Sequence, residues 1–280
     1  MRPYACTYKI YKIDKKKEDT YENTIMTVSL LTITQRSRNK CLKNLLEFIQ
    51  AQTYKNIVEW VLVEGSKTEQ DATENSEFIM REINQQTPFP IKYLSFKEGL
   101  RLSDLRNRGN AACSGAIIVC MDDDDYYPPQ RVETVVNKLM ASNKQIAGCS
   151  YAYMYDYNLD KLYKFKSFGK NHSTNNCLAY KKEYLITHKH ADGLVRGEEM
   201  SFTNDFTEPM IQLDSEDCIV ISSHQANTVD KTPLCVKTNP HLREISIKNK
   251  KNKKNKKNKK NNKNIIPPEI ILKIKASLCL

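Results

Sequence analysis

Four consecutive aspartates, Asp122 to Asp125, follow the apolar run AIIVCM. Adjacent carboxylates repel one another, and the repulsion is strong in a low-dielectric setting such as the end of a buried strand. The cluster therefore favours a cation, and carboxylate oxygens suit hard divalent ions such as Mg²⁺ or Mn²⁺. An ion held by one or two carboxylates can also bind the phosphates of a substrate. The alternative is an acidic turn or helix cap, a role in which single aspartates are common.

The segments around these aspartates alternate between strand and helix patterns. Short β-branched apolar runs predict buried strands, and apolar residues at helical spacing predict helices between them. The expected strands are 26–34, 58–66, 91–96 and 116–122, and the expected helices are 41–52, 76–84, 102–115 and 128–142. This alternation predicts a parallel sheet with helices on both faces, and such sheets bind ligands at the carboxyl ends of their strands. The aspartates stand at one of those ends, and Gly115 is expected to close the helix before them.

The second half of the chain is less regular. Residues 146–157 and 161–168 alternate like two antiparallel strands that turn around Asn158–Asp160. Shorter elements follow: a strand turning into a short helix at 178–188, a helix at 197–205, and strands at 210–214 and 218–224. We therefore predict a single α/β domain over 26–247, with a nucleotide-binding half at 26–145 and a mixed half at 146–247.

The formal net charge of +11 belongs mostly to one tract. Residues 248–264 contain ten Lys, seven Asn and nothing else, so the rest of the chain carries +1. Residues 26–247 carry −2, because the segments on either side, 1–25 and 265–280, contribute +2 and +1. The tract has no apolar residue to bury, which predicts disorder. We expect from it weak electrostatic contact with anionic surfaces and no specific nucleic-acid binding.

The sequence does not indicate a membrane-spanning, secreted or disulfide-rich protein. No stretch approaches the ~20 apolar residues of a membrane span, and residues 1–25 resemble a polar extension more than a secretory signal. The short apolar segment 265–280 is a candidate for docking on the domain, on a partner or on a surface. Nine cysteines occur without a C-x-x-C pair, and several lie in apolar runs. This indicates reduced core thiols and a soluble, cytoplasmic protein, with peripheral membrane association through the tail left open.

The string GNAACSGAIIVCMDDDDYYPPQRV, which LRNRG leads into, resembles the inverting family 2 glycosyltransferases of the GT-A fold. That family shows an Arg-Asn-x-Gly helix, a small-Gly turn, an apolar strand, an Asp-x-Asp-Asp box, aromatic residues and a proline. Three weaker segments fall in the family's order: TVSLLTITQR as its first strand and nucleotide loop, VEWVLVEGS as its second strand, and GEEMSF as its Glu-Asp base box. The resemblance covers roughly 26–235. It implies a GT-A fold, Rossmann-like, with a mixed, mostly parallel sheet.

The resemblance implies a set of nucleotide and metal contacts. Asp122 and Asp124 would form the Asp-x-Asp pair, with Asp122 nearer the ribose and Asp124 on the metal, Mn²⁺ or Mg²⁺. His224 is a further candidate for the metal or diphosphate, although a lone histidine is more often structural or exposed. Glu64 stands where the family has Asp, so a uracil contact would come from a longer acid. The implied nucleotide-sugar contacts are Thr32, Thr34, Arg36, Glu64, Arg106, Asp122 and Asp123.

The base box is also altered, because Glu198-Glu199 replaces Glu-Asp. One carboxylate within hydrogen-bond reach of an acceptor hydroxyl suffices as general base. We expect Glu199 in that role, with Glu198 as its rival. The alternative is a solvated helix start, where the helix dipole favours acids. The residues that fall near the donor sugar or acceptor are His172, Asn175, Asn176 and Asp125, although Asn, Ser and Thr are also ordinary loop residues.

The predicted function is metal-dependent transfer of a sugar, with inversion, from a nucleotide diphosphate sugar to an acceptor hydroxyl. UDP-sugar is the expected donor, and the acceptor is an unknown glycan, protein or lipid. One alternative is a nucleotidyltransferase, although TITQRSRNK lacks the Gly-rich phosphate loop usual in that class. Another is a catalytically degenerate nucleotide-sugar-binding protein with a basic interaction tail, which the altered acids Glu64 and Glu199 motivate.

Overall fold

The computed structural model describes residues 25–35, 38–65, 68–96, 99–225, 227, 231–236, 239–245, 272 and 275. The predictions for Arg36 and for 248–264 lie outside these residues, as do nearly all of 1–25 and 265–280. Within 265–280, the ammonium of Lys275 lies 2.5 Å from a carboxylate oxygen of Asp160. No helix in the described part of the chain is long and apolar enough to cross a membrane.

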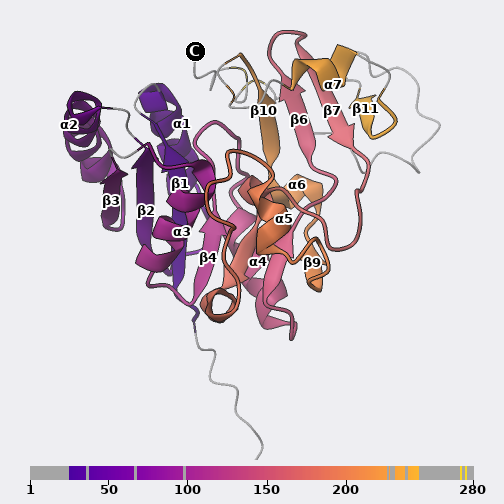
Figure 1. The fold of residues 1–280 in the computed structure, drawn as a ribbon, viewed down its shortest axis with the longest axis horizontal. Coiled ribbons are helices and arrows are strands. Elements are labelled where there is room, and N and C mark those ends of the chain that lie inside the picture. The colour runs from indigo at the N-terminus through magenta and orange to yellow at the C-terminus, as the bar shows by residue number, and fades with distance from the viewer. Residues whose placement is uncertain are drawn as a thin grey trace, which may run out of the picture.

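A seven-stranded sheet forms the centre of the molecule (Figure 1). Its order is β3 (Ile91–Phe96), β2 (Ile57–Gly65), β1 (Val28–Thr34), β4 (Ile117–Cys120), β8 (Ala179–Lys181), β5 (Ile146–Gly148) and β9 (Met210–Gln212). The first four of these strands are parallel, and β8 runs antiparallel to both β4 and β5. The predicted mixed, mostly parallel sheet is therefore confirmed.

Helices cover both faces of this sheet because its strands are apolar on both sides. On β1, Leu30 packs with one core cluster and its neighbour Leu31 with the other. The first cluster includes α1 (Asn39–Gln50), the π-helix η2 (Ile79–Ile83) and α4 (Arg131–Met140). The second includes α3 (Leu102–Ala112), the 3-10 helix η5 (Lys182–Ile186) and α5 (Glu198–Phe202).

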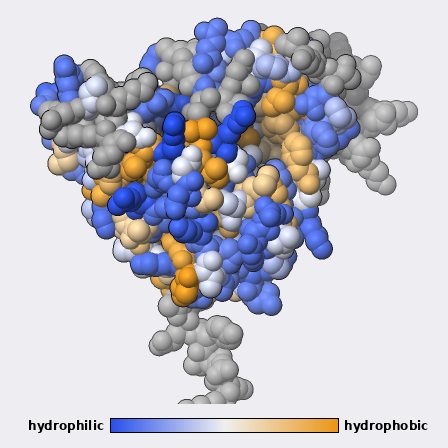
Figure 2. Space-filling model, viewed as in Figure 1, coloured by the Kyte–Doolittle hydropathy of each residue, from blue (hydrophilic) through white to orange (hydrophobic). Residues whose placement is uncertain are grey.

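A second, four-stranded sheet lies beside the first and is visible at the upper right of Figure 1. Its order is β10 (Val220–Ser223), β6 (Tyr153–Asp156), β7 (Lys161–Phe165) and β11 (Leu242–Ile245). A bridge between Tyr126 and Val220 joins it to the turn after β4. Figure 2 shows a mostly hydrophilic face with a hydrophobic strip over the small sheet. The remaining short helices are α2 (Glu69–Phe78), η3 (Asn84–Gln86), η4 (Asn175–Cys177), α6 (Ser215–Cys218) and α7 (Thr232–Val236).

Three sequence predictions need correction. The run 146–157 is not one strand, because β5 enters the main sheet and β6 the small one. The helix expected at 76–84 begins earlier, at Glu69, and ends in the π-turn η2. Gly115 does not cap α3, which ends at Ala112. A Cβ atom on Gly115 would lie 2.5 Å from the backbone nitrogen of Ser29, so the glycine is needed for close strand approach.

Candidate active site

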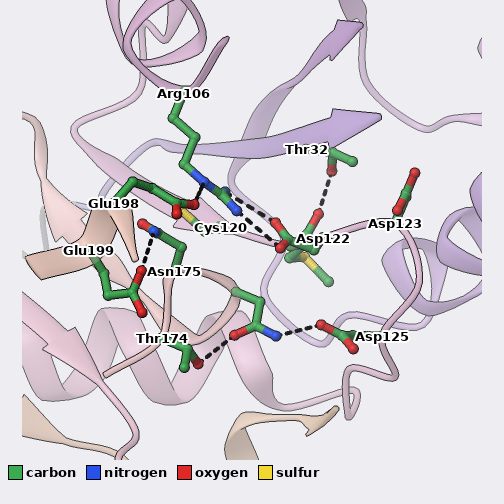
Figure 3. A network of polar contacts seen from close by, with 12 residues as sticks. Thr32, Arg106, Cys120, Asp122, Asp123, Asp125, Thr174, Asn175, Glu198 and Glu199 are labelled. Carbon is green, nitrogen blue, oxygen red and sulfur yellow. Dashed lines mark hydrogen bonds and ion pairs between the residues drawn. The ribbon is translucent and has the colours of Figure 1, made fainter. Parts of the chain in front are cut away.

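Arg106 joins two of the predicted acids (Figure 3). It projects from α3 and donates to both carboxylate oxygens of Asp122, with Nη1–Oδ1 and Nη2–Oδ2 distances of 3.2 and 3.1 Å. Its Nε donates to Oε1 of Glu198 at 2.9 Å. Arg106 and Glu198 are buried, whereas the Asp122 side chain is 23% exposed. The cation therefore fixes Asp122, at the end of the sheet, against α5, and leaves part of its carboxylate open.

Glu199 occupies a different environment from its neighbour. Gly197 precedes α5 with a φ of 65°, which turns the chain so that both acids lie in the first helical turn. Asn175 donates from Nδ2 to Oε2 of Glu199 at 3.2 Å. Burial raises the pKa of Glu199 above its usual value, and the charge on Glu198 acts in the same direction. Glu199 is thus only partly exposed, and no described basic side chain forms an ion pair with it.

Asp123 points away from Asp122 (Figure 3), and its carboxylate contacts Arg38, the residue before α1. Thr34, at the end of β1, donates to Oδ2 of Asp123 at 2.7 Å. Arg38 donates from Nη1 to Oδ1 of Asp123, also at 2.7 Å. The carboxylate is fully buried, and this burial raises its pKa to about 7 although the charge of Arg38 opposes the shift. Asp123 therefore holds the start of α1 against the carboxyl ends of β1 and β4.

Asp124 has the richest set of polar partners of the four aspartates. Its Oδ2 accepts hydrogen bonds from Nη1 of Arg38 at 2.9 Å and from Nδ2 of Asn227 at 3.0 Å. The Nε2 of His224 lies 3.3 Å from the same oxygen. Burial alone would raise the pKa of Asp124, but the hydrogen bond from His224 and the charges of Arg38 and Lys231 lower it below its usual range. The carboxylate is therefore held in its ionised form.

Asp125 connects the turn to the small sheet. Its Oδ1 accepts a hydrogen bond from the backbone nitrogen of Ser222 at 2.8 Å, and its Oδ2 accepts one from Nδ2 of Asn176 at 2.6 Å. Burial, followed by the charge on Asp124, raises the pKa of Asp125 well above its usual value. Asn176 in turn accepts a hydrogen bond from Thr174 at 2.6 Å. Asp125 and Asn176 thus order the turn and the η4 segment.

The four aspartates therefore each bind cationic or hydrogen-bond-donating groups, and Asp123 and Asp124 share Arg38, which reduces the repulsion expected from their sequence. Among the described residues, no three His, Cys, Asp or Glu side chains form a group that could hold a metal ion. The predicted ligand set is accordingly only partly assembled: Asp124 and His224 lie together, whereas Asp122 is held by Arg106. A metal site formed by Asp122, Asp124 and His224 therefore stays a prediction.

The other predicted residues are Thr32, which lies beside Asp122 in Figure 3, together with Glu64 and His172. Thr32 is fully buried, donates to the carbonyl of Met121 at 2.7 Å and accepts from Nε1 of Trp60 at 2.9 Å. Glu64 is also fully buried and accepts a hydrogen bond from the Tyr93 hydroxyl. The Thr32 hydroxyl thus connects β1 to the end of β4, and the contact between Glu64 and Tyr93 connects β2 to β3. His172 lies in an aromatic group with Phe168 and Phe206, at ring-centroid distances of 4.9 and 4.6 Å.

Several residues of the site were not predicted from the sequence. Arg38 and Asn227 contact Asp124, and Lys231 donates to the carbonyl of Ser222 at 2.8 Å. Tyr127 accepts a hydrogen bond from the backbone nitrogen of Asp122 at 2.6 Å. The aromatic pair after the aspartates was a usable signal for Tyr127. Nothing in the sequence distinguishes Arg38 or Asn227 from other polar residues of the chain.

The family model described as "Glycosyl transferase family 2" matches residues 29–191, which is more than half of the chain. The chain belongs to glycosyl transferase family 2. This match spans the strands and helices that carry all four aspartates and Arg106. The family resemblance predicted from the sequence is confirmed, and with it the class of protein, a glycosyltransferase. A search of curated proteins finds no match.

Solved structures with the same fold include TarS and a mannosyltransferase. S. aureus TarS 1-349 in complex with UDP-GlcNAc has a TM-score of 0.54 at 14% identity, over 72% of this chain and 60% of that one. The mannosyltransferase PcManGT from Pyrobaculum calidifontis, in complex with GDP-Man and Mn²⁺, has a TM-score of 0.55 at 15% identity, over 76% and 62%. This family 2 chain spans 37% of the longer TarS chain. The likeness confirms the GT-A fold.

Proposed function

We propose that the protein transfers a sugar, with inversion, from a nucleotide diphosphate sugar to an acceptor hydroxyl. The observation that carries this proposal is the single guanidinium of Arg106 between Asp122 and Glu198. It couples the acid at the sheet edge, where α/β folds bind nucleotides, to the helix that carries the candidate base. UDP-sugar remains the proposed donor, and TarS and PcManGT, which were solved with nucleotide sugars, support this class of donor.

Glu199 is the proposed general base. Glu198 is buried and its carboxylate accepts a hydrogen bond from the Arg106 cation. Among the described residues, the side chain that hydrogen-bonds to the Glu199 carboxylate is the neutral amide of Asn175. The raised pKa of Glu199 makes it a stronger base towards a hydroxyl. Glu199 would accept the acceptor's proton as the hydroxyl oxygen attacks the anomeric carbon. With no enzyme nucleophile in between, one displacement inverts the configuration.

The residues around Asp124 fit a divalent ion. An ionised carboxylate oxygen and an imidazole nitrogen lie side by side, and Mg²⁺ or Mn²⁺ needs only one or two protein ligands when substrate phosphates complete the set. Asp124 and His224 would hold the ion. When bound, such an ion neutralises charge on the departing diphosphate. The charges of Arg38 and Lys231 lower the pKa of Asp124. These two residues would therefore add positive potential near the bound diphosphate.

A cytoplasmic location is proposed from the cysteines. All seven cysteines in the described part of the chain are free thiols, and six of them are buried. Reduced thiols in this number are typical of a reducing compartment. An anionic surface remains the proposed weak partner of 248–264, and the acceptor remains a glycan, protein or lipid hydroxyl.

The test is a thermal-shift screen of UDP- and GDP-sugars with Mn²⁺, followed by donor turnover with and without EDTA. A bound donor raises the melting temperature because it binds only the folded state. We expect turnover to release a nucleoside diphosphate, to stop with EDTA and to be lost in Asp124→Ala. Unchanged, EDTA-insensitive turnover in that variant would contradict the metal assignment. Release of pyrophosphate would favour a nucleotidyltransferase, and tight UDP binding without sugar release would favour the degenerate binding protein.

A further inference from the structure

Arg131, the first residue of α4, is fully buried beneath the active-site turn. Its Nη2 donates to the carbonyl oxygens of Cys177 and Leu178, at 2.7 and 3.5 Å. Its Nη1 lies 3.2 Å from the sulfur of Cys218. Its Nε is buried without a hydrogen-bond partner. The guanidinium therefore sits in the apolar core with two carbonyls and one sulfur as its acceptors.

A buried cation needs a counter-charge. The guanidinium of arginine stays protonated in proteins, and burying a charge without a partner costs several kcal/mol. Among the described residues, no carboxylate forms an ion pair with Arg131, and the acidic groups with the largest effects on it are Cys218, Cys177, Tyr127 and Cys120. Cys218 is the one whose side chain accepts a hydrogen bond from the guanidinium.

We propose that Cys218 is ionised and forms a buried thiolate–guanidinium pair with Arg131, which positions the segments that carry the active-site acids. The distance of 3.2 Å is short for a nitrogen–sulfur contact, as charge-assisted hydrogen bonds are. Two more thiols, Cys149 and Cys177, face Cys218 from the end of β5 and from η4. Both can donate S–H hydrogen bonds to a thiolate.

The titration of the three thiols supports this assignment. Burial opposes the ionisation of Cys218, but hydrogen bonds from Cys149 and Cys177 and the charge of Arg131 together lower its pKa well below the usual value. The pKa values of Cys149 and Cys177 are raised by their hydrogen bonds to Cys218 and then by burial. One thiolate is thus shared by two thiol donors and one cation.

The pair links three segments that hold catalytic groups in place. Arg131 begins α4, six residues after Asp125. The carbonyls that it binds belong to the η4 segment, whose Asn175 contacts Glu199. Cys218 ends α6 and leads into β10, whose Ser222 nitrogen binds Asp125. Arg131 and Cys218 are therefore positioning residues, because neither of them contacts Glu199 or Asp122.

The ion pair can be tested without any substrate, by the ultraviolet absorbance of the thiolate. At about pH 6.5, some two units below the ordinary cysteine pKa of about 8.5, nearly all thiols of an unfolded chain are protonated. We expect the folded full-length protein to show thiolate absorbance that disappears in guanidinium chloride. Cys218→Ser should remove it, and Cys235→Ser should retain it. Equal absorbance before and after unfolding, or in Cys218→Ser, would overturn the pair.

The positioning role rests on the proposed transfer reaction and has its own readout. Cys218→Ser is expected to lower kcat about tenfold, because the segments next to the aspartate turn and to Asn175 would both shift. Cys218→Asp keeps an anion beside Arg131 and should recover most of the loss. An equal loss of kcat in the two variants would show that Cys218 contributes packing and not charge. If the wild type turned over no donor, the proposed function would fail, while the absorbance would still decide the ion pair.

Discussion

The Nε atom of Arg106 lies 2.9 Å from Oε1 of Glu198, and both side chains are buried. The other two nitrogens of the same guanidinium bind Asp122. A fixed, planar cation thus sets the distance between the acid after β4 and the acidic pair of α5. The donor side and the acceptor side of the proposed reaction are consequently coupled through one side chain.

Replacing Arg106 by Met leaves Glu198 buried without a cation. Breaking a buried ion pair from one side typically costs about 3–5 kcal/mol, so the free energy of unfolding should fall by about that amount. Chemical denaturation measures it. Arg108→Met is the matched control on the same helix, because Arg108 is exposed and lies 5.5 Å from the Phe96 ring as a cation–π contact. Its expected loss is about 0.5–1 kcal/mol, and equal losses in the two variants would contradict this account.

Glu199→Gln should separate chemistry from stability. Removing a general base typically lowers kcat by about 10²–10⁴-fold. Because the raised pKa shows that the folded protein disfavours the charge on Glu199, the neutral amide should not destabilise the fold at neutral pH. Glu198→Gln is the paired variant, and it should lower the melting temperature because it removes the counter-charge of Arg106. A larger kcat loss in Glu198→Gln at unchanged stability would reverse the assignment of the base.

The pH dependence follows from the direction of the Glu199 shift. Its folded pKa lies above the usual 4.5, so the base becomes protonated, and kcat falls, as the pH drops through that raised value. The linkage to stability has the opposite sense: the protonated acid is favoured in the folded state below pH 4.5, and this contribution is lost as the pH rises through the folded pKa.

Asn175 tunes that profile, since its amide donates to the Glu199 carboxylate and so favours the ionised form. Asn175→Leu should move the acidic limb of the kcat profile to higher pH. Asn171→Leu is a suitable control, because its amide binds the carbonyl of Thr207 instead. An acidic limb that is unchanged in Asn175→Leu would show that another group controls it.

Arg38 should set the affinity of the site for a divalent ion. Its Nη1 lies 2.7 Å from Asp123 and 2.9 Å from Asp124, where its charge competes with that of a metal. Arg38→Gln is expected to tighten Mn²⁺ binding in the absence of nucleotide by about fivefold or more, because a unit charge at this range is worth at least about 1 kcal/mol. The electron paramagnetic resonance signal of free Mn²⁺ measures the binding.

Two further variants serve as controls for the Mn²⁺ measurement. Lys43→Gln removes a positive charge from the same helix at an exposed ion pair with Glu82, and it should leave Mn²⁺ binding unchanged. Asp124→Asn should weaken the binding even when Arg38 is replaced as well. Equal Mn²⁺ affinity in the wild type and Arg38→Gln would show that the guanidinium does not compete with the metal.

The elements with strong local patterns could be predicted from the sequence. The strand at 91–96 has the bounds that its apolar run indicates, and the first four parallel strands follow from alternation with helices. The division of 146–157 between two sheets could not be predicted, because it depends on the neighbours of each strand and not on the run itself. Gly115 has the position expected of a helix cap. A side chain is excluded there by the backbone of Ser29, which is distant in sequence.

The acids of the site were visible in the sequence, but their partners were not. Asp122 and Glu198 stand out because carboxylates follow a buried strand or a turn. Arg106 binds both of these acids, and Arg38 binds Asp123 and Asp124. These contacts depend on the tertiary structure. Thr32 fits the family position, but its hydroxyl is occupied between Trp60 and Met121, and strand pattern gives no hint of this.

The place of β8 in the main sheet delays the pairing of β5 while the protein is being synthesised. β5 leaves the ribosome before β8, yet its partners in the sheet are β8 and β9, both later in the chain. Strands β1 to β4 can pair as they emerge, while β5 has an open edge until residues 179–181 are made. Unpaired edges of this kind are prone to aggregation. The nascent chain therefore passes through a stage in which the aspartate end of the sheet exists and its partner acid does not.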